Sequence, residues 1–316
     1  MQSGVLGRLH DKVGCYYPTT WIFLDDEERF LSSLEVTMNP KQPCCFFSNH
    51  TEALAYIERN CPNEMAFQSA PYTDVENVND FISQPNRFKE PSVVVVDFAM
   101  PGKNGIEVCQ ELLDFPIRKL LLTGVADEGL ANDAFNQGVI QGYIKKNDPF
   151  ALEKIGSYAQ SLSEHYLSQK FPVPKISAAP EVDLALVLES KEFKDFLESH
   201  SVVEYYFIKE PLGVLCISAD GGLSQIALGP RPSTHFDTQM MPESLEIKVR
   251  NDEVLVGAID KLPRTAVEAD RYDWEENAVA AVQIAKTEIW IGFPDSPASP
   301  IDFVAAQHSL NAYLEE

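Results

Sequence analysis

The most constraining feature of the sequence is a run of mostly β-branched residues, 92–96, that ends at Asp97. Apolar residues at consecutive positions, rather than at every second one, are typical of a central strand that is covered on both faces. Such strands belong to parallel sheets, whose neighbouring strands need crossover connections. The run therefore predicts an α/β fold with helices on both sides of a sheet.

Strand patterns alternate with helical patterns over the first half of the chain. We expect strands at residues 20–24, 44–48, 92–96, 119–122 and 139–144, and a helix from 149 to about 170. This order predicts a doubly wound, parallel, five-stranded sheet. Residues 61–91 interrupt the order with several Pro, Asn and Asp residues and one helical pattern at 75–82. We expect them to form an insertion that packs on the surface of this domain.

The second half has a different pattern. Strand patterns follow one another at 202–208, 213–218, 223–228, 246–249, 253–259 and 288–291, with helices expected near 190–200, 277–286 and 301–314. Asp220-Gly221-Gly222 is typical of a hairpin turn. Strands in succession predict an α+β domain with a largely antiparallel sheet.

The chain of 316 residues is long enough for two domains. Pro172-Val173-Pro174 predicts a linker after the first domain. We expect an N-terminal extension at 1–19, a first domain at 20–148, a long helix and linker at 149–180, and the second domain at 181–316.

The charge argues against a nucleic-acid partner. Residues 1–150 hold 12 Lys and Arg against 21 Asp and Glu, which leaves 13 against 27 for residues 151–316, so the two halves carry −9 and −14. Binding to nucleic acid depends on neutralising phosphates with Lys and Arg. The six cysteines form no CxxC pair, and no apolar run is long enough to span a membrane. We expect a cytoplasmic protein.

Polar residues gather where the predicted parallel strands end. They are Asp25, Asp26, Asp97, Thr123 and Lys146. The carboxyl ends of such strands meet at one edge of the sheet, where ligands bind. Three carboxylates repel one another unless a cation lies between them, and Mg²⁺ prefers such oxygen ligands. With a lysine and a hydroxyl beside them, these groups suit the formation of an acyl phosphate on one aspartate.

The motifs around these positions resemble the receiver domain of bacterial two-component response regulators. They are Leu24-Asp25-Asp26-Glu27, the segment 96–105, Leu122-Thr123-Gly124 and the segment 142–146. The resemblance covers residues 20–147 and implies a flavodoxin-like, CheY-like fold. It also implies Mg²⁺ as cofactor and a histidine kinase or phosphotransfer protein as partner.

The resemblance implies a role for each matched residue, with Asp97 as the phosphorylated aspartate. The implied metal ligands are Asp97, Asp26, Asp25 through a water, and the backbone carbonyl of Ala99. The implied switch and phosphate-binding residues are Thr123, Gly124, Tyr143 and Lys146, with Lys145 pointing to the other side of the strand. Asn147 replaces the proline that commonly follows this lysine in the family.

The second domain shows no catalytic motif. We therefore expect only the phosphotransfer and autodephosphorylation of the first domain as enzymatic activity. We expect the second domain to signal without DNA, by phosphorylation-dependent homodimerisation or by binding a protein. The alternatives are a domain that binds or turns over a small ligand such as a nucleotide, a transcription factor, and a degenerate receiver that keeps the fold without the chemistry.

Overall fold

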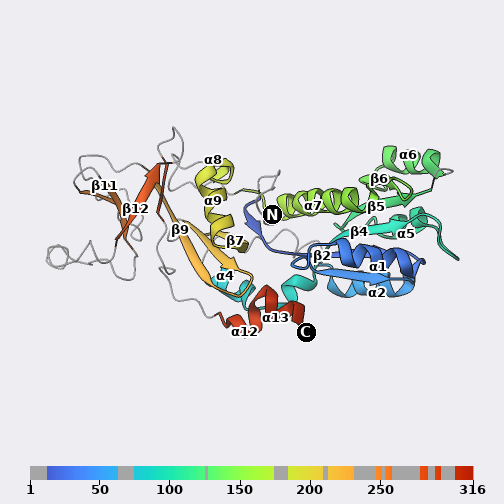
Figure 1. Cartoon of the computed structure of the whole chain (residues 1–316), viewed down its shortest axis with the longest axis horizontal. Helices are drawn as coiled ribbons and strands as arrows, with labels where there is room; N and C mark the ends of the chain where they lie inside the picture. Colours follow the sequence, from blue (N-terminus) through green and yellow to red (C-terminus); the bar gives the residue numbers. More distant parts are fainter. Residues whose placement is uncertain are drawn as a thin grey trace. The chain divides into compact units, whose positions relative to one another are not determined.

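The computed structural model of the chain describes residues 13–62, 75–124, 127–173, 184–208, 213–230, 247–250, 253–257, 278–283, 289–292 and 303–315. The chain forms two compact units (Figure 1). The parallel unit comprises Pro18–Ser69 and Asn86–Phe171, and the antiparallel unit comprises Met1–Tyr17, Ala70–Pro85 and Pro172–Glu316. Each unit is described by itself.

The parallel unit is built on a five-stranded sheet in the order β3-β2-β4-β5-β6, in which all neighbours run parallel. The strands are β2 (Thr20–Leu24), β3 (Cys44–Phe47), β4 (Pro91–Asp97), β5 (Arg118–Thr123) and β6 (Gly142–Lys145). The predicted doubly wound fold is confirmed. The last strand begins later than predicted, because Val139 and Ile140 turn into the core beside α6 (Glu128–Asn136) instead of joining the sheet.

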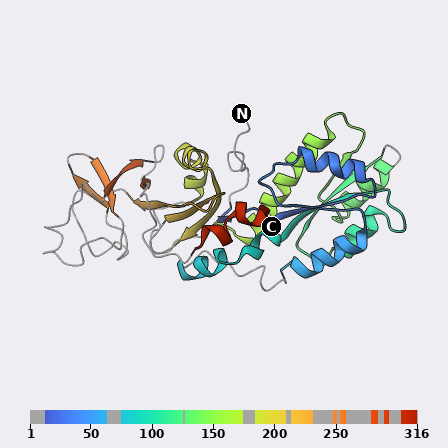
Figure 2. The ribbon, with the colours of Figure 1, turned by 60° about the horizontal axis from the view of Figure 1, so that its bottom comes forward.

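Helices cover both faces of this sheet (Figure 2). One face packs against α1 (Glu28–Thr37) and α7 (Ala151–Lys170), and the other packs against α2 (His50–Asn60), α5 (Gly105–Glu111) and α6. Along β4, Val93 and Val95 face the first group while Val94 and Val96 face the second, and each is at most 1% exposed. Each buried valine contributes about 1.5–3 kcal/mol. Burial on both faces explains the unbroken apolar run.

The antiparallel unit contains an eight-stranded sheet in the order β1-β7-β8-β9-β13-β12-β11-β10. The strands are β1 (Cys15–Tyr16), β7 (Val202–Ile208), β8 (Gly213–Ser218), β9 (Leu223–Pro230), β10 (Ile247–Arg250), β11 (Glu253–Gly257), β12 (Ala278–Gln283) and β13 (Ile289–Gly292). The described helices are α4 (Val75–Ile82), α8 (Leu184–Glu189), α9 (Lys191–Ser199), α12 (Ala305–His308) and α13 (Leu310–Glu315). The predicted antiparallel α+β fold is confirmed, and the Asp220-Gly221-Gly222 turn joins β8 to β9 with Gly221 at φ 87°.

Two helix predictions in this unit are wrong. The segment predicted as a helix at 277–286 contains β12 instead, which pairs with β11 and β13 on its two sides. Hydrogen bonds from both neighbours override the helix propensity of its alanines. The helix predicted at 301–314 is divided into α12 and α13, with Ser309 between them.

The N-terminal extension and the insertion contribute to the antiparallel unit, which differs from the predicted domain boundaries. β1 pairs antiparallel with β7, and the Tyr205 hydroxyl donates to the Val13 carbonyl at 3.0 Å. On one face of β7, Phe81 of α4 packs edge-on against Tyr206; on the other face, Phe193 of α9 packs against Tyr205. The sequence did not predict β1, because a two-residue strand shows no periodicity. It predicted α4 but not its packing on β7, because the two are distant in sequence.

The chain passes between the two units at four points, after Tyr17, Ser69, Pro85 and Phe171. Segments of the two units therefore alternate along the chain. Among the described helices, none combines the length and the apolar character that a membrane span requires.

Candidate functional site

The carboxyl ends of four parallel strands bring the candidate site together. Asp25 and Asp26 follow β2, Asp97 ends β4, Thr123 ends β5, and Lys146 follows β6. Backbone hydrogen bonds hold the strand ends in register: the amide of Phe98 donates to the Leu122 carbonyl (2.8 Å) and that of Lys146 to the Thr123 carbonyl (3.0 Å). The five residues gathered from the sequence thus lie on four neighbouring strand ends of one sheet.

The three aspartates form a compact carboxylate cluster. Each offers an oxygen, and these oxygens lie within 4.8 Å of one another. Asp25 and Asp97 are buried while Asp26 is exposed, so the cluster is open to solvent on one side. Oxygen ligands with an open side are the arrangement that Mg²⁺ uses, because this ion keeps several of its waters. The chemistry of this donor set fits the metal that the resemblance implies.

Lys146 lies between two of the carboxylates. Its Nζ is 2.6 Å from Asp25 Oδ2 and 2.8 Å from Asp97 Oδ1. Burial alone would lower the pKa of Lys146, but the hydrogen bonds and charges of the two aspartates outweigh burial and raise it. The lysine therefore stays charged. Lys145 lies on the other side, where its Nζ pairs with Glu128 at 2.7 Å, as the strand geometry predicted.

Opposing effects act on the pKa of Asp25, and their balance raises it. Burial raises its pKa, while the hydrogen bonds from Lys146 and from the Glu27 amide, the latter at 2.9 Å, act in the opposite direction. The nearby Asp97 charge raises the pKa further. A buried carboxylate beside a second one is stabilised by any cation that joins the cluster.

Thr123 presents a buried hydroxyl beside the cluster. Its Oγ1 has no hydrogen-bond partner among the described residues. A buried polar atom without a partner is uncommon and costly. An incoming ligand with an acceptor oxygen would satisfy this hydroxyl, so the atom suits a phosphoryl group.

The remaining predicted residues lie around the same edge. Gly124 is exposed, and a Cβ there would come no closer than 3.3 Å to Asp127 Oδ2. Tyr143 is half-buried against the core beneath α6. Ala99 follows Asp97 by two residues and is exposed, and its role as a carbonyl ligand stays a prediction. Asn147 is exposed within a turn that the Asp148 amide closes on the Lys145 carbonyl at 3.1 Å.

Two residues near the site were not singled out from the sequence. The ring of Phe30, in the first turn of α1, lies 4.9 Å from Lys146 Nζ in a cation–π contact. A Cβ on Gly105, which begins α5, would lie 2.3 Å from the Asp97 carbonyl oxygen. The capping box of Asn104 and Glu107 marks the start of this helix in the sequence, but nothing in the sequence reports its closeness to Asp97.

The chain is similar to known response regulators in sequence and in structure. No protein-family model matches it. It is 30% identical over 139 residues to the transcriptional regulatory protein DesR of Bacillus subtilis, which is 41% of this chain and 66% of DesR, just under two thirds of that relative.

The response regulator LqsR of Legionella pneumophila has a similar structure, with a TM-score of 0.70 and 23% identity, over 96% of this chain and 95% of that one. A receiver domain of a putative Luxo repressor protein from Vibrio parahaemolyticus matches 47% of this chain and 92% of its own length, at 12% identity and a TM-score of 0.35. The likeness to LqsR extends over both units and shows the fold. With the strand order, it shows that the parallel unit has the flavodoxin-like fold of response-regulator receiver domains, and the sequence similarity to DesR agrees with that fold.

Proposed function

We propose that this protein is the response regulator of a two-component phosphorelay, which accepts a phosphoryl group on Asp97 and signals through the antiparallel unit without binding DNA. The observation that carries the proposal is the position of the Lys146 ammonium between Asp25 and Asp97, within a cluster of three carboxylates. The donor is a histidine kinase or a phosphotransfer protein. A protein of this kind acts in the cytoplasm.

In the proposed reaction, an Asp97 carboxylate oxygen attacks the phosphorus of the donor. The new P–O bond forms as the P–N bond to the donor histidine breaks, and the imidazole leaves. The ammonium of Lys146 neutralises one phosphoryl oxygen, and the free hydroxyl of Thr123 donates to another. The small side chain of Gly124 leaves room for entry.

Asp25, Asp26, Asp97 and the Ala99 carbonyl would hold Mg²⁺. Bound there, the ion would neutralise charge that develops on the phosphoryl oxygens. Without a cation, the buried pair Asp25 and Asp97 would meet an incoming anion with two negative charges and only Lys146 to balance them. The phosphotransfer to Asp97 and the hydrolysis of the resulting acyl phosphate to inorganic phosphate are the only catalytic activities proposed.

We propose that the signal leaves the site through α6, β6 and α7. When Thr123 turns toward the phosphoryl group, Tyr143 can turn inward behind it, which changes the surface made by these elements. Leu130 and Phe135 on α6 and Tyr158 on α7 are 54%, 47% and 41% exposed, so these helices offer large apolar side chains that a partner could bury. This surface suits a regulated homodimer or a protein partner.

The charge supports an output that does not involve DNA. DesR is a transcriptional regulatory protein, but the match to it extends over 139 residues only. Residues 151–316 carry 13 basic against 27 acidic side chains, and such a surface repels a phosphate backbone. A domain that binds a small ligand is the alternative output.

A labelling experiment tests the proposed reaction. With Mg²⁺ and a small acyl-phosphate donor, the wild-type protein should gain one phosphoryl group, and Asp97→Asn should gain none. Lys146→Met should slow labelling by at least about tenfold, because the variant loses a charged hydrogen bond worth roughly 1.5–3 kcal/mol. Its neighbour Lys145→Met, which breaks only the exposed pair with Glu128, should label at close to the wild-type rate.

The outcomes of labelling are unambiguous. If the wild-type protein stays unlabelled while an established receiver is labelled in parallel, the parallel unit is a degenerate receiver.

Sizing the protein with and without beryllium fluoride, which imitates a phosphoryl group on a carboxylate, tests the output. A doubled mass supports regulated dimerisation, and an unchanged mass favours a partner or a small ligand.

A further inference from the structure

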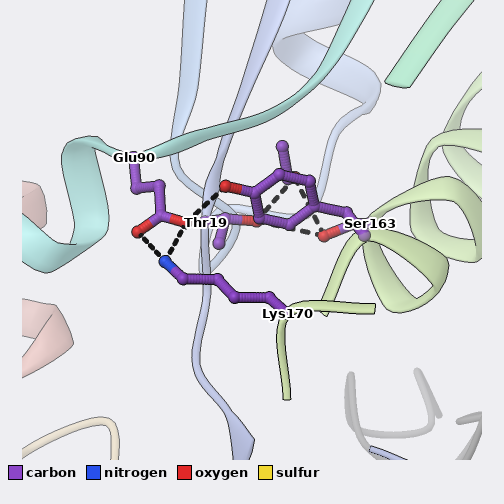
Figure 3. Close-up of polar contacts among 6 residues, drawn as sticks. Thr19, Glu90, Ser163 and Lys170 are labelled. Carbon is purple, nitrogen blue, oxygen red and sulfur yellow. Dashed lines mark hydrogen bonds and ion pairs between the residues drawn. The ribbon is translucent and has the colours of Figure 1, made fainter. Parts of the chain in front are cut away.

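A buried polar cluster lies at the end of the parallel sheet that is opposite to Asp97. We call it the base cluster; its members are Thr19, Glu90, Ser92, Ser163, Tyr166 and Lys170 (Figure 3). Each of these residues is at most 8% exposed. The cluster takes no part in the proposed phosphotransfer, so its burial calls for a separate explanation.

One half of the base cluster is an ion pair. Lys170 Nζ donates to both carboxylate oxygens of Glu90, at 2.6 Å from Oε2, and the Tyr166 hydroxyl donates to Oε1 at 2.5 Å. Figure 3 shows the Lys170 side chain extended toward Glu90. Burial, reinforced by the Glu90 charge, raises the pKa of Tyr166 well above its usual value, so this hydroxyl stays protonated and remains a donor.

The other half is a ring of three hydroxyls. Thr19 Oγ1 donates to Ser92 Oγ (2.6 Å), Ser92 Oγ donates to Ser163 Oγ (3.0 Å), and Thr19 and Ser163 are 3.0 Å apart. Each hydroxyl can donate once and accept more than once, so a closed ring satisfies all three. The ring connects Thr19, which directly precedes β2, and Ser92 of β4 to Ser163 of α7.

The base cluster fixes the register of α7 against the sheet. Ser163, Tyr166 and Lys170 are spaced by three and four residues, so they share one face of the helix. A helix that packs only through apolar side chains can shift along the sheet with little loss of contact. A buried ion pair and a ring of hydroxyls form their hydrogen bonds in one position of the helix only. Buried pairs add little net stability compared with apolar packing, but breaking one leaves a costly unpaired charge. Their use here is specificity of position.

The position that the cluster fixes is where the chain leaves the parallel unit. Thr19 comes two residues after the crossing at Tyr17, Glu90 comes five after the crossing at Pro85, and Lys170 directly precedes Phe171. The cluster thus joins three of the four crossings to one another. Glu90 directly precedes β4 (Pro91–Asp97) and Asp97 is its last residue, so one strand links the base cluster to the carboxylate cluster.

We propose that the base cluster is a transmission joint, which holds α7 and three of the chain crossings together so that a change at Asp97 reaches the antiparallel unit as one concerted movement. This inference rests on the proposed phosphorylation of Asp97 and adds how that signal leaves the unit. Glu90, Tyr166 and Lys170 act here as positioning residues, because none of them is part of the carboxylate cluster.

The test compares the response of the intact chain in three variants. Tyr166→Phe removes the hydrogen bond to Glu90 and keeps the buried aromatic side chain, so this variant should fold. The double variant Glu90→Gln with Lys170→Met removes both charges together and leaves no unpaired charge. Lys154→Met is the matched control. Lys154 lies in the first half of the same helix and forms an ion pair at the surface with Asp148, which precedes the helix.

Two quantities are measured for each protein: labelling of Asp97, and hydrogen–deuterium exchange of the amides in β7 and β8 with and without beryllium fluoride and Mg²⁺. We expect beryllium fluoride to change the exchange of β7 and β8 in the wild-type protein and in Lys154→Met. In the two base-cluster variants we expect Asp97 to label within about twofold of wild type, while the change in exchange falls by roughly fivefold or more.

Each outcome decides the matter. Normal labelling with an undiminished response in Tyr166→Phe and in the double variant overturns the joint and leaves the proposed phosphorylation intact. The absence of any wild-type response despite normal labelling also overturns the joint. Failure of the wild-type protein to label removes the proposed function, and the joint with it. If the double variant does not fold, Tyr166→Phe alone decides by the same criteria.

Discussion

The two units of this chain differ in how far apart in sequence their partners lie. In the parallel unit, every strand of the sheet comes from residues 20–145, with a helix between successive strands. In the antiparallel unit, the two-residue strand β1 pairs with β7, almost two hundred residues later, and α4, more than a hundred residues before β7, packs on the same strand. The parallel unit is local in its connections, and the antiparallel unit is closed by distant ones.

This difference has a consequence for independence. Residues 172–316 alone lack β1 and α4, so the edge and one face of β7 would be exposed. An exposed edge strand with an apolar face promotes aggregation. The antiparallel unit therefore depends on β1, which leads into the start of β2, and on α4, which leads toward the start of β4, the strand that carries Asp97. A signal at Asp97 has several covalent routes to it.

Removing residues 1–17 should have the largest effect on the comparison. The deletion removes Val13, Cys15, Tyr16 and Tyr17, each at most 2% exposed, and we expect a loss of more than about 5 kcal/mol at roughly 1.5–3 kcal/mol for each large side chain. Hydrogen exchange should accelerate in β7 far more than in β4. Deleting only residues 1–12 is the control, since it keeps β1. Equal acceleration in β4 would show that the two units do not unfold separately.

A pair of glycine variants acts on the parallel unit instead. In Gly105→Ala the new methyl group would lie 2.3 Å from the Asp97 carbonyl oxygen, which is backbone and cannot move aside, so we expect a loss of about 3 kcal/mol. In Gly129→Ala of α6, nothing lies within 4 Å, and we expect a gain of about 0.5–1 kcal/mol. Thermal unfolding measures both. Equal effects of the two substitutions would contradict the close contact of α5 with Asp97.

Mg²⁺ and pH should act on the parallel unit through Asp25. Because its pKa is raised in the folded state, Asp25 binds more protons in the folded than in the unfolded protein at pH values between its ordinary pKa of 3.8 and the raised pKa. Its contribution to stability therefore falls as pH rises through that window. Mg²⁺ should offset the loss, by about 2.7 kcal/mol at a concentration 100 times Kd. Asp25→Asn should weaken the pH slope and reduce the gain from Mg²⁺. A wild-type protein whose unfolding temperature ignores Mg²⁺ would count against the metal site.

The sequence predicted much of the parallel unit because its signals are local. An apolar run buried on both faces is visible at 92–96, and polar residues directly after strands marked Asp25, Asp97 and Lys146. The roles of these residues in phosphotransfer remain predictions. In the antiparallel unit a succession of strands was predicted correctly, but a helix was predicted at 277–286, where β12 (Ala278–Gln283) takes its conformation from its two neighbouring strands. Contacts across the fold, such as β1 on β7, leave no local signal.

The contact between Phe30 and Lys146 is the smallest effect that the comparison offers, and it separates packing from charge. The ring lies 4.9 Å from the ammonium, and a cation–π contact at a partly exposed site contributes about 0.5–1 kcal/mol. Phe30→Leu keeps apolar packing against the core but removes the attraction, so we expect phosphorylation of Asp97 to slow by about two- to fivefold with little change in unfolding temperature. Phe135→Leu, an exposed aromatic position on α6, is the control and should label normally. If Phe30→Leu labels at the wild-type rate, Asp25 and Asp97 alone are sufficient to hold the lysine in place. A parallel loss of stability would mean that the ring serves the core of α1 and not the charge of Lys146.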